Sequence, residues 1–274
     1  MIEIEKQEIN ALRLEVLSSV RDFCEQSGLQ YFLAHSSLLG AIRDKSFIPW
    51  NLNASIMLRR EEYESFSRLF NEWSATNTPK LKVISAHDTP DYGLPFIRVI
   101  NTDTVLVEKN GFGPSVNVAV FPIDGMGNNR KEAEKRIKKI ETLTAALMYK
   151  TYGRSPNIMR SFGARLISRL NSKGAIVKKI DGLCKKSTVA ESSLLAVPFG
   201  TNAVRAIMSR DVFDTQEKAE LEGELFAVPI GYDRYLKALY GDYMSLPAET
   251  ERKEKEYRVF KKNKEINYGT ETNC

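Results

Sequence analysis

Apolar residues at steps of three and four positions predict an amphipathic helix near the start of the chain, and Gly28 supplies its stop. The buried stripe of this helix would consist of Ile9, Leu12, Val16, Val20 and Phe23. A second stripe, in residues 61–73, comprises Tyr63, Phe66, Leu69 and Phe70. A third precedes Gly241 and comprises Tyr232, Tyr235, Leu236, Leu239 and Tyr240. The chain is therefore expected to contain several helices that bury one face each.

Shorter apolar runs predict strands at residues 29–34, 53–58, 81–86, 95–100, 104–109 and 116–121. Gly111, Gly113 and Pro114 mark a turn between the last two strands, which we expect to extend one sheet. Strands interspersed with helices predict a mixed α/β chain of the α+β class, with a central mixed sheet flanked by helices.

The segment between the first two strands is suited to anions. Small residues at Ser36 and Ser37 predict a turn, and residues 38–43 predict the helix that follows it. The free N–H groups and the dipole of such a helix start favour negative charge. In the next strand, alternation places Asn53, Ser55 and Met57 on one face.

Composition sets the broad class of the protein. The chain has 274 residues, of which 42% are hydrophobic and 27% charged, as is usual for a globular protein. It contains no apolar run long enough for a membrane-spanning helix, and residues 1–10 lack the apolar core of a signal peptide. The three cysteines show neither metal-ligand nor disulfide spacing. These features predict a cytoplasmic protein.

Three blocks of sequence have the character of motifs. The first is residues 29–63, YFLAHSSLLGAIRDKSFIPW at its centre; the second is Phe121-Pro122-Ile123-Asp124-Gly125; the third spans residues 232–247. In this order they resemble the LicD family of phosphocholine and related phospho-group transferases. The resemblance implies a nucleotidyltransferase-like core, in which three acids on two adjacent strands hold magnesium or manganese. It also implies a metal-dependent phosphotransferase of cell-surface glycan decoration, acting on lipopolysaccharide, teichoic acid or capsule.

The acids of that family pattern are replaced in this sequence. Their positions correspond to Asn53, Ser55 and Ala119, which provide an amide, a hydroxyl and a methyl group. Because magnesium binds chiefly through carboxylates, phosphates and retained water, we expect no metal cofactor. A neighbouring acid could substitute, and the candidates are Asp44, Asp124 and Glu61. Each also suits a structural role: Asp124 precedes Gly125 in a predicted turn, and Glu61 begins a helix.

The remaining site candidates are phosphate-binding groups, namely His35, Ser36, Ser37, Arg43 and Arg98. His35 and Ser36 occupy the positions of two glycines in the family pattern, and Arg98 that of a lysine. A protonated His35 could donate a hydrogen bond to a phosphate, or His35 could only cap the turn. Arg98 could face the cleft or lie exposed on its strand.

The middle of the chain is strongly basic. Residues 130–186 contain 16 Lys or Arg and only 4 Asp or Glu, whereas the net charge of the whole chain is +5. An apolar stripe within residues 156–173 includes Phe162, Leu166 and Leu170 beside Arg165 and Arg169. Such a helix can lie on an anionic membrane at its inner face, or it can pack its stripe on the core. Packing is the commoner arrangement and is our expectation.

These features divide the chain into four parts: a nucleotidyltransferase-like core at 1–129, a basic helical insertion at 130–190, a helical C-terminal part at 191–248, and a charged, frayed tail at 249–274. No zinc-finger, basic-zipper or RNA-recognition signature is present, which argues against a nucleic-acid partner. Two functions stay open: a pseudoenzyme that binds a nucleotide or glycan or pairs with an active paralogue, and an active transferase that uses a CDP-linked donor and a glycan acceptor. The replaced acids favour the pseudoenzyme.

Overall fold

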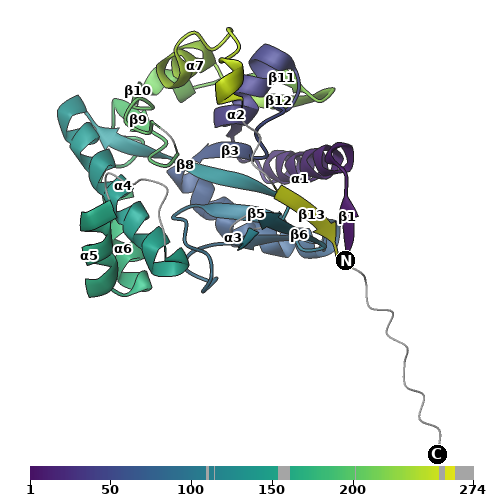
Figure 1. Cartoon of the computed structure of the whole chain (residues 1–274). Coiled ribbons are helices and arrows are strands. Elements are labelled where there is room, and N and C mark those ends of the chain that lie inside the picture. The colour runs from purple at the N-terminus through teal and green to yellow at the C-terminus, as the bar shows by residue number, and fades with distance from the viewer. Residues whose placement is uncertain (109–110, 114, 154–160, 201, 253–256, 263–274) are drawn as a thin grey trace, which may run out of the picture.

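The computed structural model describes residues 1–108, 111–113, 115–153, 161–200, 202–252 and 257–262. Figure 1 shows a central sheet with helices on its sides, and a separate group of helices on the left. The expected mixed α+β class with a central mixed sheet is therefore confirmed.

The largest sheet in the described part of the chain has seven strands. Its long strand, β8 (Asn117–Gly127), pairs in parallel with β3 (Ala54–Arg59) and antiparallel with β5 (Ile97–Asn101). β2 (Tyr31–Leu33) continues the sheet beyond β3, and β4 (Leu81–Ile84) continues it beyond β5. The second half of β8 pairs with β9 (Leu194–Ala196), which pairs with β10 (Met208–Ser209). This register brings the candidate strands together at the middle of the sheet.

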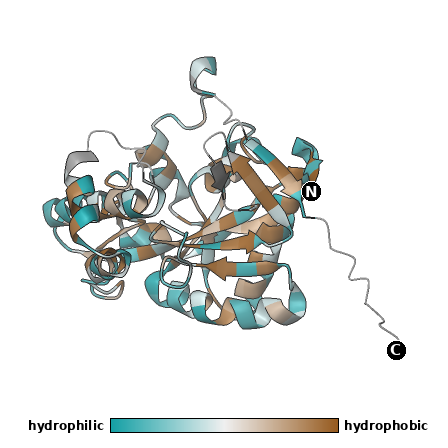
Figure 2. Ribbon diagram, turned by 60° about the horizontal axis from the view of Figure 1, so that its bottom comes forward, coloured by the Kyte–Doolittle hydropathy of each residue, from teal (hydrophilic) through white to brown (hydrophobic). Residues whose placement is uncertain are grey.

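Two long helices, α1 (Lys6–Gln26) and α3 (Arg60–Asn77), pack on one another and on the sheet. Their contact is aromatic, with the ring of Phe23 5.1 Å from the rings of both Phe66 and Phe70. The predicted stripes of these two helices are confirmed, except that Leu12 is only partly buried and Leu69 is 36% exposed. Figure 2 shows apolar strands in the interior and hydrophilic helical faces outside. This core holds the central strands in place.

A second, four-stranded sheet joins the two ends of the described chain. Its order is β1 (Ile2–Ile4), β13 (Tyr257–Lys261), β6 (Thr104–Glu108) and β7 (Gly111–Gly113). Three expectations were therefore wrong. Residues 104–108 do not extend the central sheet, residues 111–113 form a strand rather than only a turn, and residues 257–261 are a paired strand rather than a frayed tail.

The basic insertion forms three helices in the described residues, α4 (Arg130–Tyr152), α5 (Ser161–Leu170) and α6 (Lys173–Cys184). The side chain of Asn129 caps the start of α4 by accepting from the amide of Glu132, and Gly153 ends this helix with φ 68°. None of the helices in the described residues combines the length and the hydrophobicity needed to cross a bilayer.

Contrary to our expectation, the C-terminal part is not mainly helical. Besides β9 and β10 it contains a hairpin of β11 (Gln216–Leu221) and β12 (Glu224–Pro229), and one α-helix, α7 (Tyr232–Tyr240), among the described residues. The helix ends at Gly241 as predicted, with Tyr235, Leu236 and Leu239 buried. These elements lie next to β2 and the residues that follow it, where the candidate residues His35, Ser36 and Ser37 are found (Figure 1).

Candidate functional site

Three candidate positions lie in one row across the central sheet. Ser55 of β3 pairs with Ala119 of β8, and Arg98 of β5 pairs with Ala119 from the other side. Directly paired residues project from the same face of a sheet, so these three side chains are neighbours. Asn53 lies just before β3 and is exposed. The structure thus brings together the positions that the sequence pattern had connected.

The side chains in this row do not fit the divalent cation implied by the family resemblance. Ser55 is 2% exposed, and its hydroxyl donates to the carbonyl oxygen of Ala34 at 2.8 Å. Ala119 provides only a methyl group. Across the described residues, no group of three His, Cys, Asp or Glu side chains could hold a metal. Since magnesium in proteins needs carboxylate oxygens and water, this donor set is a poor match.

Two of the three acids considered as substitutes bind arginines of the fold instead. Asp124 is fully buried within β8 and binds Arg60 through two hydrogen bonds, of 2.6 and 2.8 Å. It is five positions from Ala119, so it projects from the opposite face of the strand. Its expected role in a turn was therefore wrong. Asp44 binds the neighbouring Arg43, and Glu61 is an exposed residue in the first turn of α3.

The predicted phosphate turn is part of a helix. α2 (His35–Leu39) starts directly after β2 and continues into a π-helical segment, Gly40–Asp44, so Ser36 and Ser37 are helical rather than a turn before the helix. The hydroxyl of Ser36 donates to the carbonyl of Asn53 at 3.2 Å, and the hydroxyl of Ser37 accepts from the amide of Ser55 at 2.9 Å. Both serines therefore fasten α2 to the start of β3.

His35 is a neutral packing residue in this structure. Its backbone has φ 46°, a left-handed conformation that favours glycine, and its ring lies 4.8 Å from that of Phe121. Burial lowers the pKa of His35 from 6.5 to about 4, although a hydrogen bond with the backbone of Phe199 opposes this effect. At neutral pH this shift disfavours the protonated form of His35 that could donate a hydrogen bond to a phosphate.

The two candidate arginines have different surroundings. The side chain of Arg43 is 5% exposed and its guanidinium binds both carboxylate oxygens of Asp44, so its charge is neutralised within the fold. Arg98 is partly buried, and its Nε is completely covered. Among the described residues it has no hydrogen bond or ion pair, and its Cζ lies 5.7 Å from the centre of the Phe96 ring.

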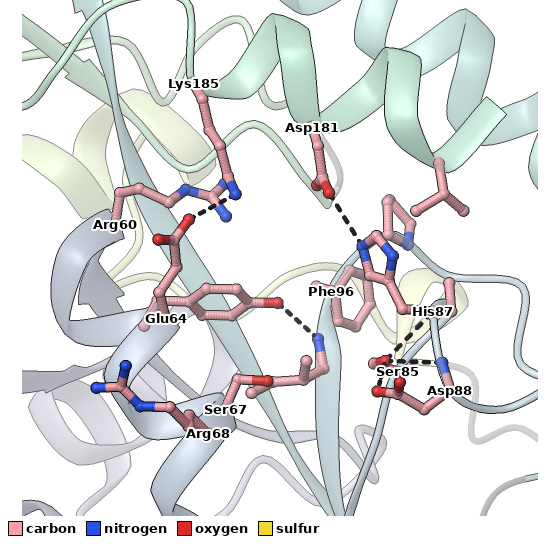
Figure 3. A pocket seen from close by; sticks show the side chains of 15 residues that line it. Arg60, Glu64, Ser67, Arg68, Ser85, His87, Asp88, Phe96, Asp181 and Lys185 are labelled. Atoms are coloured by element: carbon pink, nitrogen blue, oxygen red, sulfur yellow. Dashed lines mark hydrogen bonds and ion pairs between the residues drawn. The ribbon is translucent and has the colours of Figure 1, made fainter. Parts of the chain in front are cut away.

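A separate pocket of about 300 Å³ lies between α3, the β4–β5 connection and α6. Figure 3 shows two contacts across it, a hydrogen bond between His87 and Asp181 at 3.0 Å and an ion pair between Lys185 and Glu64 at 2.6 Å. The cationic lining residues Arg60 and Lys185 are thus paired with acids, and exposed Arg68 stands at the pocket without a partner among the described residues. Sequence reasoning missed this pocket because its walls come from segments about a hundred residues apart.

Comparison with known proteins identifies the segment that carries the row. The family described as LicD/FKTN/FKRP, nucleotidyltransferase domain, matches residues 28–122, which contain Ser55, Arg98 and Ala119. The lipopolysaccharide cholinephosphotransferase LicD of Haemophilus influenzae is 24% identical over 247 residues, which cover 88% of this chain and 91% of that protein. The row of Ser55, Arg98 and Ala119 therefore lies in a segment that matches this nucleotidyltransferase domain, and most of the chain is similar to the Haemophilus LicD protein.

Proposed function

We propose that this chain takes part in the decoration of a cell-surface glycan, as a pseudoenzyme that binds a phosphate-containing donor without a catalytic metal. The glycan context is supported by the Haemophilus relative, whose name states transfer of phosphocholine to lipopolysaccharide and whose alignment covers most of both chains. The donor class would be a nucleoside diphosphate linked to a head group, and the acceptor a lipopolysaccharide or comparable glycan.

The pairing of Ser55 with Ala119 carries the proposal. A metal-dependent transferase would need negative side chains here, because a divalent cation neutralises charge on the donor diphosphate and on the leaving nucleotide. Ser55 already donates its hydroxyl to the backbone, and Ala119 has no donor atom. Two adjacent positions of the row are thus without the charge that would retain a cation.

Arg98 gives this row a fixed positive charge of its own. A covered guanidinium nitrogen without a hydrogen bond is costly, so such a group calls for a ligand or another explanation. In a domain with carboxylates at positions 55 and 119, those acids would neutralise the arginine. With serine and alanine there, the guanidinium is free to hold a phosphate by charge-assisted hydrogen bonds. We therefore place the donor diphosphate at Arg98.

Calorimetric titration with cytidine diphosphate, with and without magnesium, tests this proposal. We expect affinity to change less than about twofold on addition of magnesium and to fall at least about tenfold in Arg98→Gln, the loss typical of one charge-assisted contact. Arg68→Gln is the matched control, since Arg68 is an exposed arginine at the separate pocket. Metal-enhanced binding, or turnover of CDP-choline with a glycan acceptor, would instead favour the active transferase.

Restoring the acids tests the geometry of the row. The variant Asn53→Asp/Ser55→Asp/Ala119→Asp should lose thermal stability without metal, because it buries carboxylates, and should regain it with manganese. The control Ser55→Asn/Ala119→Asn has nearly the same side-chain volumes without the charge, and should not respond to manganese. If the triple variant folds but binds no manganese, the side chains at positions 53, 55 and 119 do not project together as we infer.

A further inference from the structure

Helix α5 leaves two of its leucines exposed while its small residues are buried, and Ile167 packs partly on the core. Its small residues Ala164 and Ser168 are 0% and 8% exposed, whereas Leu166 and Leu170 are 53% and 75% exposed. Residues in an α-helix are about 100° apart, so Leu166 lies opposite the buried pair. The expectation that this stripe packs on the core is therefore wrong for both leucines. Phe162, which was predicted to belong to the stripe, has a side chain outside the described residues.

The same outward face is cationic. Arg165 and Arg169 are exposed beside the two leucines, and α5 contains no acidic residue. Lys179 of α6 donates to the side chain of Asn171 at 2.7 Å, which places a further ammonium group just beyond the end of α5. In Figure 1, α5 lies at the outer side of the helical group on the left, away from the central sheet. Leucines and cations are therefore offered together at one edge of the molecule.

We propose that α5 is a docking surface for an anionic lipid membrane. The two leucines would enter the boundary between headgroups and acyl chains, and Arg165, Arg169 and Lys179 would meet lipid phosphates. Charge complementarity favours this partner, because residues 130–186 carry 12 more basic than acidic residues. A protein partner fits less well, since a helix of ten residues is only about 15 Å long, and a stable protein interface buries about 800 Å² on each side.

Sedimentation with lipid vesicles tests this surface, using the whole chain. The protein should bind vesicles that contain phosphatidylglycerol, should not bind vesicles of phosphatidylcholine alone, and should bind more weakly as salt is added. Arg169→Gln should weaken binding about fivefold, as expected for the loss of one charge near an anionic surface. Leu170→Ser should weaken it by at least a similar factor, because a leucine that is 75% exposed would be buried in the bilayer.

Two control variants match these changes at other parts of the surface. Leu225→Ser alters a leucine of β12 that is 59% exposed, and Lys82→Gln removes one exposed charge on β4; neither should change vesicle binding by as much as twofold. The proposal is overturned if the wild-type protein does not bind anionic vesicles at low salt, or if the controls weaken binding as much as the α5 variants. It is also overturned if the protein binds no vesicles but self-associates, and if Leu170→Ser abolishes that self-association. The surface would then be assigned to a second copy of this chain.

Discussion

Replacing Asp124 with asparagine is expected to destabilise the protein strongly, because it leaves the buried Arg60 without a counter-charge. Asp124 is fully buried and the side chain of Arg60 is 12% exposed. Burial alone would lower the pKa of Arg60, but the attraction and hydrogen bonds of Asp124 raise it, so the guanidinium stays charged. Arg136 adds a second cation nearby, held by the carbonyl of Gly125 at 2.8 Å. One carboxylate therefore compensates two partly buried cations.

The size of the loss can be estimated from this geometry. Opposite charges about 4 Å apart attract by about 4 kcal/mol at an effective dielectric constant of about 20. Removing one member of a buried pair costs about 3–5 kcal/mol, because the remaining charge stays buried without a partner. For a chain of this size, that loss lowers the thermal midpoint by on the order of 10 °C. We expect Asp124→Asn to lose this amount of unfolding free energy.

Chemical denaturation of Asp124→Asn and of a double variant measures the effect. Arg60→Met/Asp124→Leu should be more stable than Asp124→Asn, because a buried apolar pair can replace a buried ion pair at little cost. Asp181→Asn is the control, since the partner of Asp181 is His87, whose side chain is 59% exposed. This substitution should cost about 1 kcal/mol of unfolding free energy or less.

The result also bears on the metal question. A loss below about 1 kcal/mol in Asp124→Asn would refute the structural role assigned to this carboxylate, because it would show that Arg60 does not depend on it. The case for Asp124 as a substitute metal ligand would then reopen. Manganese binding by the wild-type protein that disappears in this variant would establish that case directly.

Two further predictions concern His35 and Gly125. His35 has a pKa of about 4 against an ordinary 6.5, so as pH falls the unfolded chain takes up this proton before the folded protein does. The wild-type protein should therefore lose on the order of 2 kcal/mol of unfolding free energy between pH 6.5 and pH 4. The His35→Gln variant should not show this loss when both proteins are denatured at a series of pH values. Gly125→Ala would place a methyl group 2.7 Å from the carbonyl oxygen of Ser187 and should cost about 1–3 kcal/mol, whereas Gly182→Ala in α6 has open space and should gain about 0.5–1 kcal/mol in the same denaturation assay.

Strand alternation is the part of the candidate site that could be predicted from the sequence. The side-chain period of a strand is two whatever the strand pairs with, so Ser55 could be assigned to a face before its partner was known. Helices with one wide apolar stripe, such as α1 and α7, were predictable for the same reason. The choice of partner strand was not. β6 and β8 are both apolar, yet β6 pairs with a strand about 150 residues away.

The environment of a polar residue was harder to predict than its position. Asp124 precedes a glycine, which made a turn plausible, but the strand continues to Gly127 and the carboxylate meets Arg60 from a helix 64 positions earlier. Ser36 and Ser37 were predicted to form a phosphate-binding turn, but their hydroxyls bond to backbone groups of Asn53 and Ser55. Hydrogen-bond partners of this kind depend on tertiary contacts that no local pattern contains.

Helix α5 shows why a hydrophobic stripe alone does not decide which face is buried. The helix has a large apolar side with Leu166 and Leu170 and a small one with Ala164, and the small side is the buried one. Small residues let two helices approach closely, so α4 and α5 can pack tightly through that side. Burying a leucine instead would stabilise a protein by about 1.5–3 kcal/mol. A fold that leaves two leucines and two arginines outward forgoes that stabilisation, and contact with an anionic bilayer is the setting in which all four side chains gain.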